Sequence, residues 1–191
     1  IHPDDKRLHP GQAPAQPHPE DNRGGEGGER AVRGSLVLED GTVYEGESVG
    51  AEGYAFGEAV FTTSMSGYQE TATDPSFEGQ IVTFTAPMIG NYGINAEDPE
   101  SARPQVAGVV VRELSRSYSN WRAGGDLTSY LVQAQIPILH SIDTRQLTRH
   151  LRSVGVMRGI IAPGSDPSDA AREALSSCPS MEGLDLATGV S

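Results

Sequence analysis

Short apolar runs separated by turn-forming residues are the dominant pattern of this chain from Gly34 onward. Each run has the length and the β-branched composition of a strand rather than those of a helix. The expected strands cover residues 35–39, 42–46, 59–63, 81–85, 107–112, 136–139 and 156–162. Asp40-Gly41 stands between the first two runs and is a strong signal for a tight hairpin turn. Residues 50–57 are expected to form a loop.

Helical patterns appear only in the second half of the chain. Asp143 is suited to cap a helix in which Leu147 and Leu151 share one face at i, i+4 spacing. Asp126 is suited to cap a shorter helix, and residues 166–176 form a final amphipathic segment. Strands that come early and helices that alternate with strands later predict an α+β or mixed α/β fold.

The amino-terminal segment has a different composition. Residues 1–30 are rich in Gly and Pro and nearly lack large apolar side chains, so they cannot bury enough surface to offset the entropy of ordering. We expect a disordered leader over residues 1–33 and a domain over residues 34–191. The leader lacks a continuous apolar stretch, and its acidic residues are atypical of a transit peptide. Since Cys178 is the only cysteine, a reducing compartment and hence the cytoplasm is expected.

Charge and residue types exclude several classes of function. A net charge of −12 disfavours nucleic acid as a partner, because phosphate binding needs Lys and Arg. No apolar run approaches the roughly 20 residues that cross a bilayer, so no membrane partner is expected. Lys6 is the only lysine, which excludes a phosphate-binding loop of the Gly-Lys type, and no zinc-ligand spacing is present. Cys178 precedes Pro179 and lacks the glycines of a nucleophile elbow, so we expect no catalytic residue and no metal ligand.

The segment 61–95 is rich in hydroxyl, amide and aromatic residues and reads FTTSMSGYQETATDPSFEGQIVTFTAPMIGNYGIN. Residues 64–76 are expected to form a loop, and polar loops on a rigid scaffold often carry binding sites. Asp74-Pro75-Ser76 has two interpretations. It is either a turn that satisfies its own backbone or a group of polar side chains presented to a small ligand.

A basic stripe marks the helix that follows Asp143. Arg145, Arg149 and Arg152 lie on the face opposite the leucines. Such a stripe is often only a solvated face. In an acidic chain it is also a local field of opposite sign, which could hold the domain against an acidic partner surface.

Three motifs in order carry a resemblance to a known family: LEDGT-x-Y-x-G at residues 38–46, TSMSGYQE-x3-DPS with its IGN loop at residues 63–91, and IDTRQLTRHLR at residues 142–152. Together they closely resemble the amino-terminal domain of the small, glutamine-handling chain of carbamoyl phosphate synthetase. The resemblance covers about residues 34–191 and implies a layered β/β/α domain of the swivelling type.

The resemblance implies a subunit of the enzyme that makes carbamoyl phosphate from glutamine, bicarbonate and ATP for arginine and pyrimidine synthesis. In the family, the serine at the position of Ser76 lies near the boundary with the glutaminase domain and contributes to glutamine binding. The amino-terminal domain docks the large subunit, and we assign Arg145, Arg149 and Arg152 to that interface.

The same resemblance implies that the chemistry lies elsewhere. The Cys, His and Glu triad belongs to a glutaminase domain expected to be absent from this chain. ATP and Mg²⁺ are expected on the large subunit, with no cofactor on this chain, which alone is expected to be inactive. The alternative is a stand-alone, non-catalytic binding or assembly module.

Overall fold

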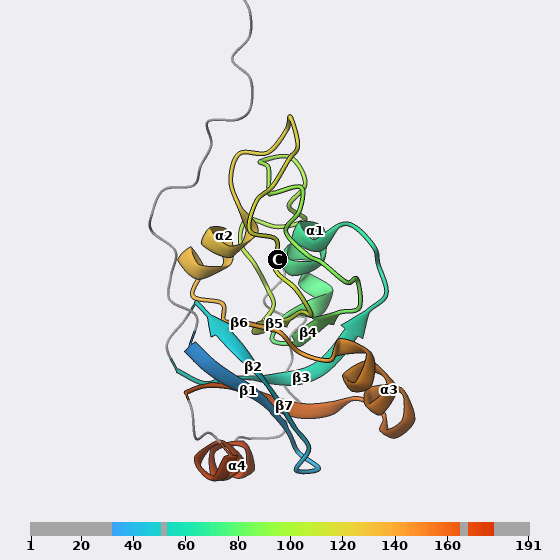
Figure 1. The fold of residues 1–191 in the computed structure, drawn as a ribbon, viewed down its shortest axis with the longest axis vertical. Coiled ribbons are helices and arrows are strands. Elements are labelled where there is room, and N and C mark those ends of the chain that lie inside the picture. The colour runs from blue at the N-terminus through green and yellow to red at the C-terminus, as the bar shows by residue number, and fades with distance from the viewer. Residues whose placement is uncertain (1–31, 51–52, 165–167, 178–191) are drawn as a thin grey trace, which may run out of the picture.

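The computed structural model describes residues 32–50, 53–164 and 168–177, so the expected leader and Cys178 lie outside the described residues. Within these ranges a single sheet closes on itself as a barrel (Figure 1). Its strands are β1 (Val32–Leu38), β2 (Val43–Val49), β3 (Ala55–Thr62), β4 (Ile81–Phe84), β5 (Gly108–Val110), β6 (Ile138–His140) and β7 (Met157–Pro163). Around the barrel they follow the order β1-β2-β6-β5-β4-β3-β7, and β7 pairs with β1 to close it.

Both antiparallel and parallel pairs occur in the barrel. β1 and β2 form the hairpin predicted from Asp40-Gly41, and Gly41 adopts the positive φ of 87° that the turn needs. The β3–β4, β4–β5 and β5–β6 pairs are parallel, and parallel neighbours require crossover connections. These crossovers carry the polar segments that the sequence singles out.

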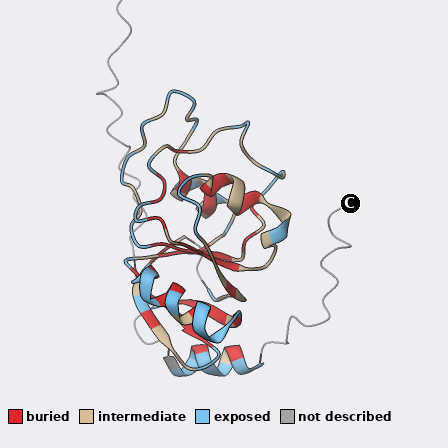
Figure 2. Ribbon diagram, turned by 90° about the vertical axis from the view of Figure 1, so that its right-hand side faces the viewer, coloured by how far each residue is buried: buried red, intermediate tan, exposed pale blue. Residues whose placement is uncertain are grey.

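Helices lie around the barrel: α1 (Tyr68–Thr73), the 3₁₀ turn η2 (Pro75–Phe77), α2 (Leu127–Gln133), α3 (Thr144–Val154) and α4 (Ser168–Ser177). In Figure 1, α1 and α2 lie above the sheet, whereas α3 lies at its lower right and α4 beneath it. Figure 2 shows that α3 and α4 turn buried residues toward the barrel and exposed ones outward. The α+β fold class is therefore confirmed.

Both faces of β1 are buried, which explains its uninterrupted apolar run. Leu36 and Leu38 point into the cluster that fills the barrel and that α3 completes. Val37 points to the other face, where it packs with Leu175 of α4. A third cluster joins α1 and α2 to the outer side of β4, β5 and β6.

Two sequence predictions need correction. The segment 64–76 is not a continuous loop, because α1 occupies residues 68–73. The residues 50–57 are not all loop either, because β3 begins at Ala55. Neither segment has a clear local periodicity, and both owe their structure to partners far away in the sequence.

Candidate functional site

The helix α1 is held at its start by a pair of tyrosines. Gly67 caps the helix in the left-handed conformation, with φ of 80°, and offers no side chain to the free amides. Tyr92 replaces that cap, because its Oη accepts hydrogen bonds from Gly67 N at 2.6 Å and from Tyr68 N at 3.3 Å. The rings of Tyr68 and Tyr92 stack with centroids 4.1 Å apart and planes at 19°.

The hydroxyl of Tyr68 binds the backbone of the loop that carries Tyr92. Tyr68 Oη donates to Gly93 O at 2.6 Å and accepts from Tyr92 N at 3.2 Å. Burial raises the pKa of both phenols, so both remain protonated at neutral pH. Gly93 has φ of 70°, and a Cβ there would lie 2.7 Å from Gly125 O, which explains a glycine in the IGNYG loop.

Two further polar residues of α1, Gln69 and Thr73, bind the segment 95–101. Gln69 Nε2 donates to Asn95 O at 2.8 Å, and Asn95 N donates to Gln69 Oε1 at 3.0 Å. At the end of the helix, Thr73 Oγ1 accepts from Glu100 N at 2.9 Å, and Thr73 O accepts from Ser101 Oγ at 2.6 Å. Hydrogen bonds therefore join α1, from its start to its end, to the segment 92–101.

Ser76 lies on η2, directly after this unit. Asp74 Oδ1 accepts from Ser76 N at 2.8 Å, so the turn interpretation describes the backbone correctly. Ser76 is exposed, and its hydroxyl makes no hydrogen bond within the described part of the chain. Because no base contacts it, Ser76 is unsuited to be a nucleophile. Its exposed hydroxyl is, however, accessible to a ligand.

Sequence reasoning missed the tyrosine pair and the buried carboxylate of Glu70 beside it. The Oε2 atom of Glu70 is buried and has no hydrogen-bond partner among the described residues, and this carboxylate raises the pKa of both tyrosines. The spacing of three residues between Gly67 and Glu70 is typical of a helix start and could have predicted α1. The stack between Tyr68 and Tyr92 left no local signal.

The basic stripe lies on α3 as predicted. Leu147 and Leu151 are 0% and 3% exposed in the barrel core, whereas Arg145, Arg149 and Arg152 are all exposed. The prediction of which face is buried is therefore confirmed.

A groove of about 570 Å³ separates α3 from the β1–β2 hairpin. It is lined by Thr42, Tyr44, Asp143, Arg145, Gln146, Arg149, His150 and Ser153. His150 Nε2 lies 2.7 Å from Asp40 Oδ2 and joins the helix to the hairpin turn. Partial burial alone would raise the pKa of Asp40, but hydrogen bonds from Thr42 and His150 outweigh it and lower that pKa.

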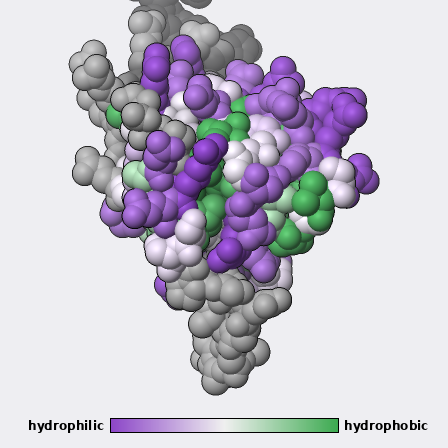
Figure 3. All heavy atoms as spheres, turned by 90° about the horizontal axis from the view of Figure 1, so that it is seen from below, coloured by the Kyte–Doolittle hydropathy of each residue, from purple (hydrophilic) through white to green (hydrophobic). Residues whose placement is uncertain are grey.

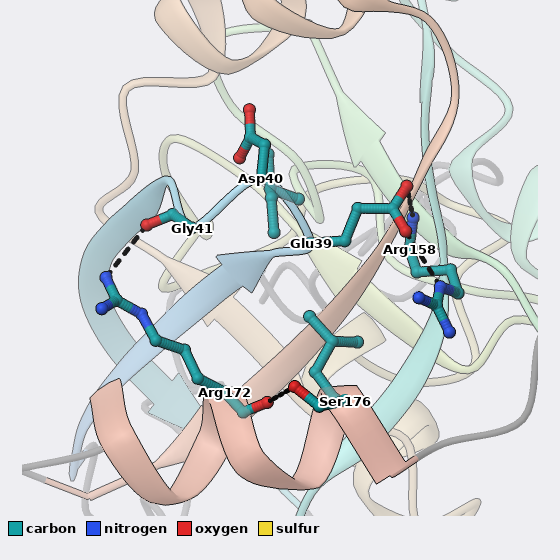
Figure 4. A pocket seen from close by; sticks show the side chains of 8 residues that line it. Glu39, Asp40, Gly41, Arg158, Arg172 and Ser176 are labelled. Atoms are coloured by element: carbon teal, nitrogen blue, oxygen red, sulfur yellow. Dashed lines mark hydrogen bonds and ion pairs between the residues drawn. The ribbon is translucent and has the colours of Figure 1, made fainter.

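A second depression, of about 530 Å³, lies on the other side of the hairpin, against α4. Figure 4 shows that its charged side chains are engaged: Glu39 pairs with Arg158 at 2.9 Å, and Arg172 donates to Gly41 O at 3.0 Å. Seen from below, hydrophilic side chains cover most of the visible face, and hydrophobic ones show only in small patches (Figure 3).

Comparison with known proteins assigns these motifs to a family. Residues 36–161 match the family described as Carbamoyl-phosphate synthase small chain, CPSase domain. This chain belongs to that family. The carbamoyl phosphate synthase small chain of Synechococcus sp. is 53% identical over 152 residues, which cover 79% of this chain and 39% of that protein. Those of Synechocystis sp. and Akkermansia muciniphila are 53% and 49% identical over 79% and 81% of this chain, and 39% and 41% of their own lengths.

The family match begins in β1 and ends in β7, so this CPSase domain corresponds to the barrel. It includes Ser76 and the whole of α3. The chain spans about two-fifths of the length of the curated small chains it matches. Among solved structures, an aminopeptidase from Aneurinibacillus sp. strain AM-1 gives a TM-score of 0.41 at 15% identity over 71% of this chain and 33% of that chain, a likeness too weak to support an inference.

Over residues 32–50, 53–164 and 168–177, no helix of this small-chain domain is long and apolar enough to cross a membrane. In the same ranges, no group of three or more His, Cys, Asp or Glu side chains could hold a metal ion.

Proposed function

We propose that this chain is part of the small subunit of a glutamine-hydrolysing carbamoyl phosphate synthase, a ligase of the amidotransferase type. The family match over residues 36–161 supports the proposal most strongly. The full small chain assembles with a large subunit as a heterodimer in the cytoplasm and supplies it with ammonia from glutamine. The product, carbamoyl phosphate, serves arginine and pyrimidine synthesis.

In this proposal the described domain supports catalysis without performing it. Glutamine is hydrolysed by a Cys-His-Glu triad on a glutaminase domain of the full small chain, and ATP and Mg²⁺ bind to the large subunit. A full-length small chain combined with a large subunit should form carbamoyl phosphate from glutamine, bicarbonate and ATP. Residues 1–191 alone should release no glutamate. Glutamate release that Cys178→Ala abolishes would contradict this division of labour.

Ser76 is proposed to contribute to the glutamine site. Its backbone is fixed by Asp74, and its exposed hydroxyl has no partner within the described residues, so it is free to bind a ligand polar group. Loss of one such hydrogen bond costs about 0.5–1.5 kcal/mol, which is up to about a tenfold change in affinity.

The test uses the complete enzyme. Ser76→Ala should raise the KM for glutamine up to about tenfold, whereas Ser64→Ala, which removes another exposed hydroxyl of the same motif, should leave it unchanged. Ammonia-dependent synthesis, which bypasses glutamine, should be equal in both variants. Equal glutamine KM and kcat in Ser76→Ala and the wild type would refute the role.

Arg145, Arg149 and Arg152 are proposed to dock the large subunit, because they form an exposed basic stripe on an otherwise acidic chain. Surface charges act mainly on the association rate and its salt dependence. The triple Arg→Ala variant should therefore fold normally but bind the large subunit more slowly at low salt. Association and dissociation rates that both match the wild type across a salt titration would show that the stripe is only solvated.

A further inference from the structure

The groove between α3 and the β1–β2 hairpin has contacts between its walls and at its end. The contact of 2.7 Å between His150 Nε2 and Asp40 Oδ2 joins its two walls. At one end, Asp143 Oδ1 accepts from Gln146 N at 2.9 Å and so caps the helix. Asp40 is thus held by His150 and Asp143 by the start of the helix, and within the described residues neither forms an ion pair with an arginine of the groove.

Two arginines in this groove lack a partner. Arg145 and Arg149 line it, and within the described part of the chain neither forms a hydrogen bond or an ion pair. The other depression differs, because Arg172 donates to a backbone oxygen and Arg158 pairs with Glu39. The groove therefore presents two available guanidinium groups on one wall.

Their spacing suits one carboxylate. Residues one helical turn apart have Cβ atoms about 5–6 Å apart, so both guanidinium forks can reach the same oxyanion. Tyr44 lines the opposite wall, where burial and the nearby carboxylates of Asp40 and Asp143 raise the pKa of its phenol. The phenol thus remains protonated and can donate a further hydrogen bond.

The form of the groove favours a protein side chain over a free small molecule. Small-molecule sites enclose most of their ligand and have mainly apolar walls. This groove is lined mostly by exposed polar residues, and Tyr44 is its one buried lining residue. When an acidic side chain of a partner protein enters the groove, the surrounding surface of that partner covers the groove and excludes water. The chain's net charge of −12 repels acidic surfaces elsewhere, which makes this groove selective.

We propose that the groove receives one Asp or Glu side chain of the large subunit, whose carboxylate binds between Arg145 and Arg149. The inference rests on the proposed function, since it names the chemistry of the docking contact. The inference also assigns different roles to the three arginines of the basic stripe, because Arg152 does not line the groove. Arg152 acts as a peripheral charge, whereas the other two form a contact that becomes buried on assembly.

Binding kinetics of the full-length small chain with the large subunit test this division. Removing one side of a buried charged contact mainly raises the dissociation rate, whereas removing a peripheral charge mainly lowers the association rate. Arg145→Ala and Arg149→Ala should each raise the dissociation rate at least about 30-fold. Arg152→Ala, the matched control, should change the dissociation rate less than about twofold. Thermal melting checks that all three variants fold.

Carbodiimide coupling then identifies the acidic partner. None of the described residues is a lysine, so Arg149→Lys introduces a single lysine amine into this described domain, on α3, and retains the charge. Carbodiimide should join this amine to one carboxylate of the large subunit, which mass spectrometry identifies. Arg152→Lys is the control and should not couple to that residue.

The outcomes separate the two proposals. If the wild-type subunits do not associate, the proposed function fails. If they associate but Arg145→Ala and Arg149→Ala dissociate like the wild type, only the groove inference is overturned. Coupling of the introduced amine to an acid of the small chain would also overturn it. So would saturable binding of inorganic phosphate to the small chain that Arg149→Ala abolishes, because a free anion would then occupy the groove.

Discussion

Replacing Tyr92 by phenylalanine removes one oxygen atom and tests whether the tyrosine pair holds the signature motif in place. The hydroxyl accepts from Gly67 N at 2.6 Å and from Tyr68 N at 3.3 Å, at the start of a short helix with no side-chain cap. A buried donor without a partner costs about 1–3 kcal/mol, and the longer bond adds less than the shorter one. The ring stack remains. Tyr92→Phe should therefore lower the free energy of unfolding by about 2 kcal/mol.

Urea unfolding followed by far-UV circular dichroism measures this change. Tyr54→Phe is the matched control, because Tyr54 is 46% exposed and its hydroxyl makes no hydrogen bond within the described ranges. The control should change stability by less than about 0.5 kcal/mol. If Tyr92→Phe behaves like the control, the hydroxyl does not cap α1 and the reasoning is refuted. A changed urea m-value would instead indicate an altered denatured state.

Three further predictions concern the core and the pH dependence of stability. Leu147→Ala empties a site with 0% exposure and should cost about 2–5 kcal/mol in urea unfolding, whereas Val156→Ala, at a site 64% exposed, should change stability by less than about 0.5 kcal/mol; equal losses would contradict the assignment of the core. The folded-state pKa of Asp40 lies below 3.8, so its stabilisation is present above that pH and is lost as the pH falls through the folded pKa. Asp40→Asn should accordingly have a lower Tm than the wild type at pH 7, with a difference that narrows as the pH falls through the folded-state pKa, and a constant difference would argue against it. Burial lowers the folded-state pKa of His140 below 6.5 despite Glu47, so protonation favours the unfolded chain and stability falls as the pH drops below 6.5. His140→Gln should flatten this part of the Tm profile, and an unchanged slope would refute the assignment.

Local signals predicted the elements that depend on neighbouring residues. Asp126 and Asp143 cap α2 and α3 through hydrogen bonds to Ser129 N and Gln146 N, each within three residues. The Asp40-Gly41 turn is equally local. In these places the sequence pattern and the structure agree because the same few residues determine both.

Elements that depend on distant partners were not predictable in this way. The start of α1 depends on Tyr92, and Gln69 binds Asn95, 26 residues away. The closure of the barrel by β1 and β7 is still less local, since Leu36 pairs with Ile161. Single-sequence patterns carry no information on such pairings, so the barrel and the helix in the motif were missed.

The candidate sites also differ in whether nearby or distant residues determine them. The pattern around Ser76 predicts only its turn, and its assignment to glutamine came from the family resemblance. The stripe of Arg145 and Arg149 was predictable from helical spacing. The groove beside it was not, because its other wall is joined to α3 by the contact of His150 with Asp40, 110 residues away.

The closure of the barrel by its first and last strands has a consequence for biosynthesis. β1 leaves the ribosome early, but its partner β7 ends only at Pro163. Until then β1 and β3 each lack a neighbour, and unpaired strand edges promote association with other chains. Contacts between residues so far apart also make folding slow. The nascent chain therefore keeps open strand edges until β7 has been synthesised, and this is the stage at which a chaperone would protect it.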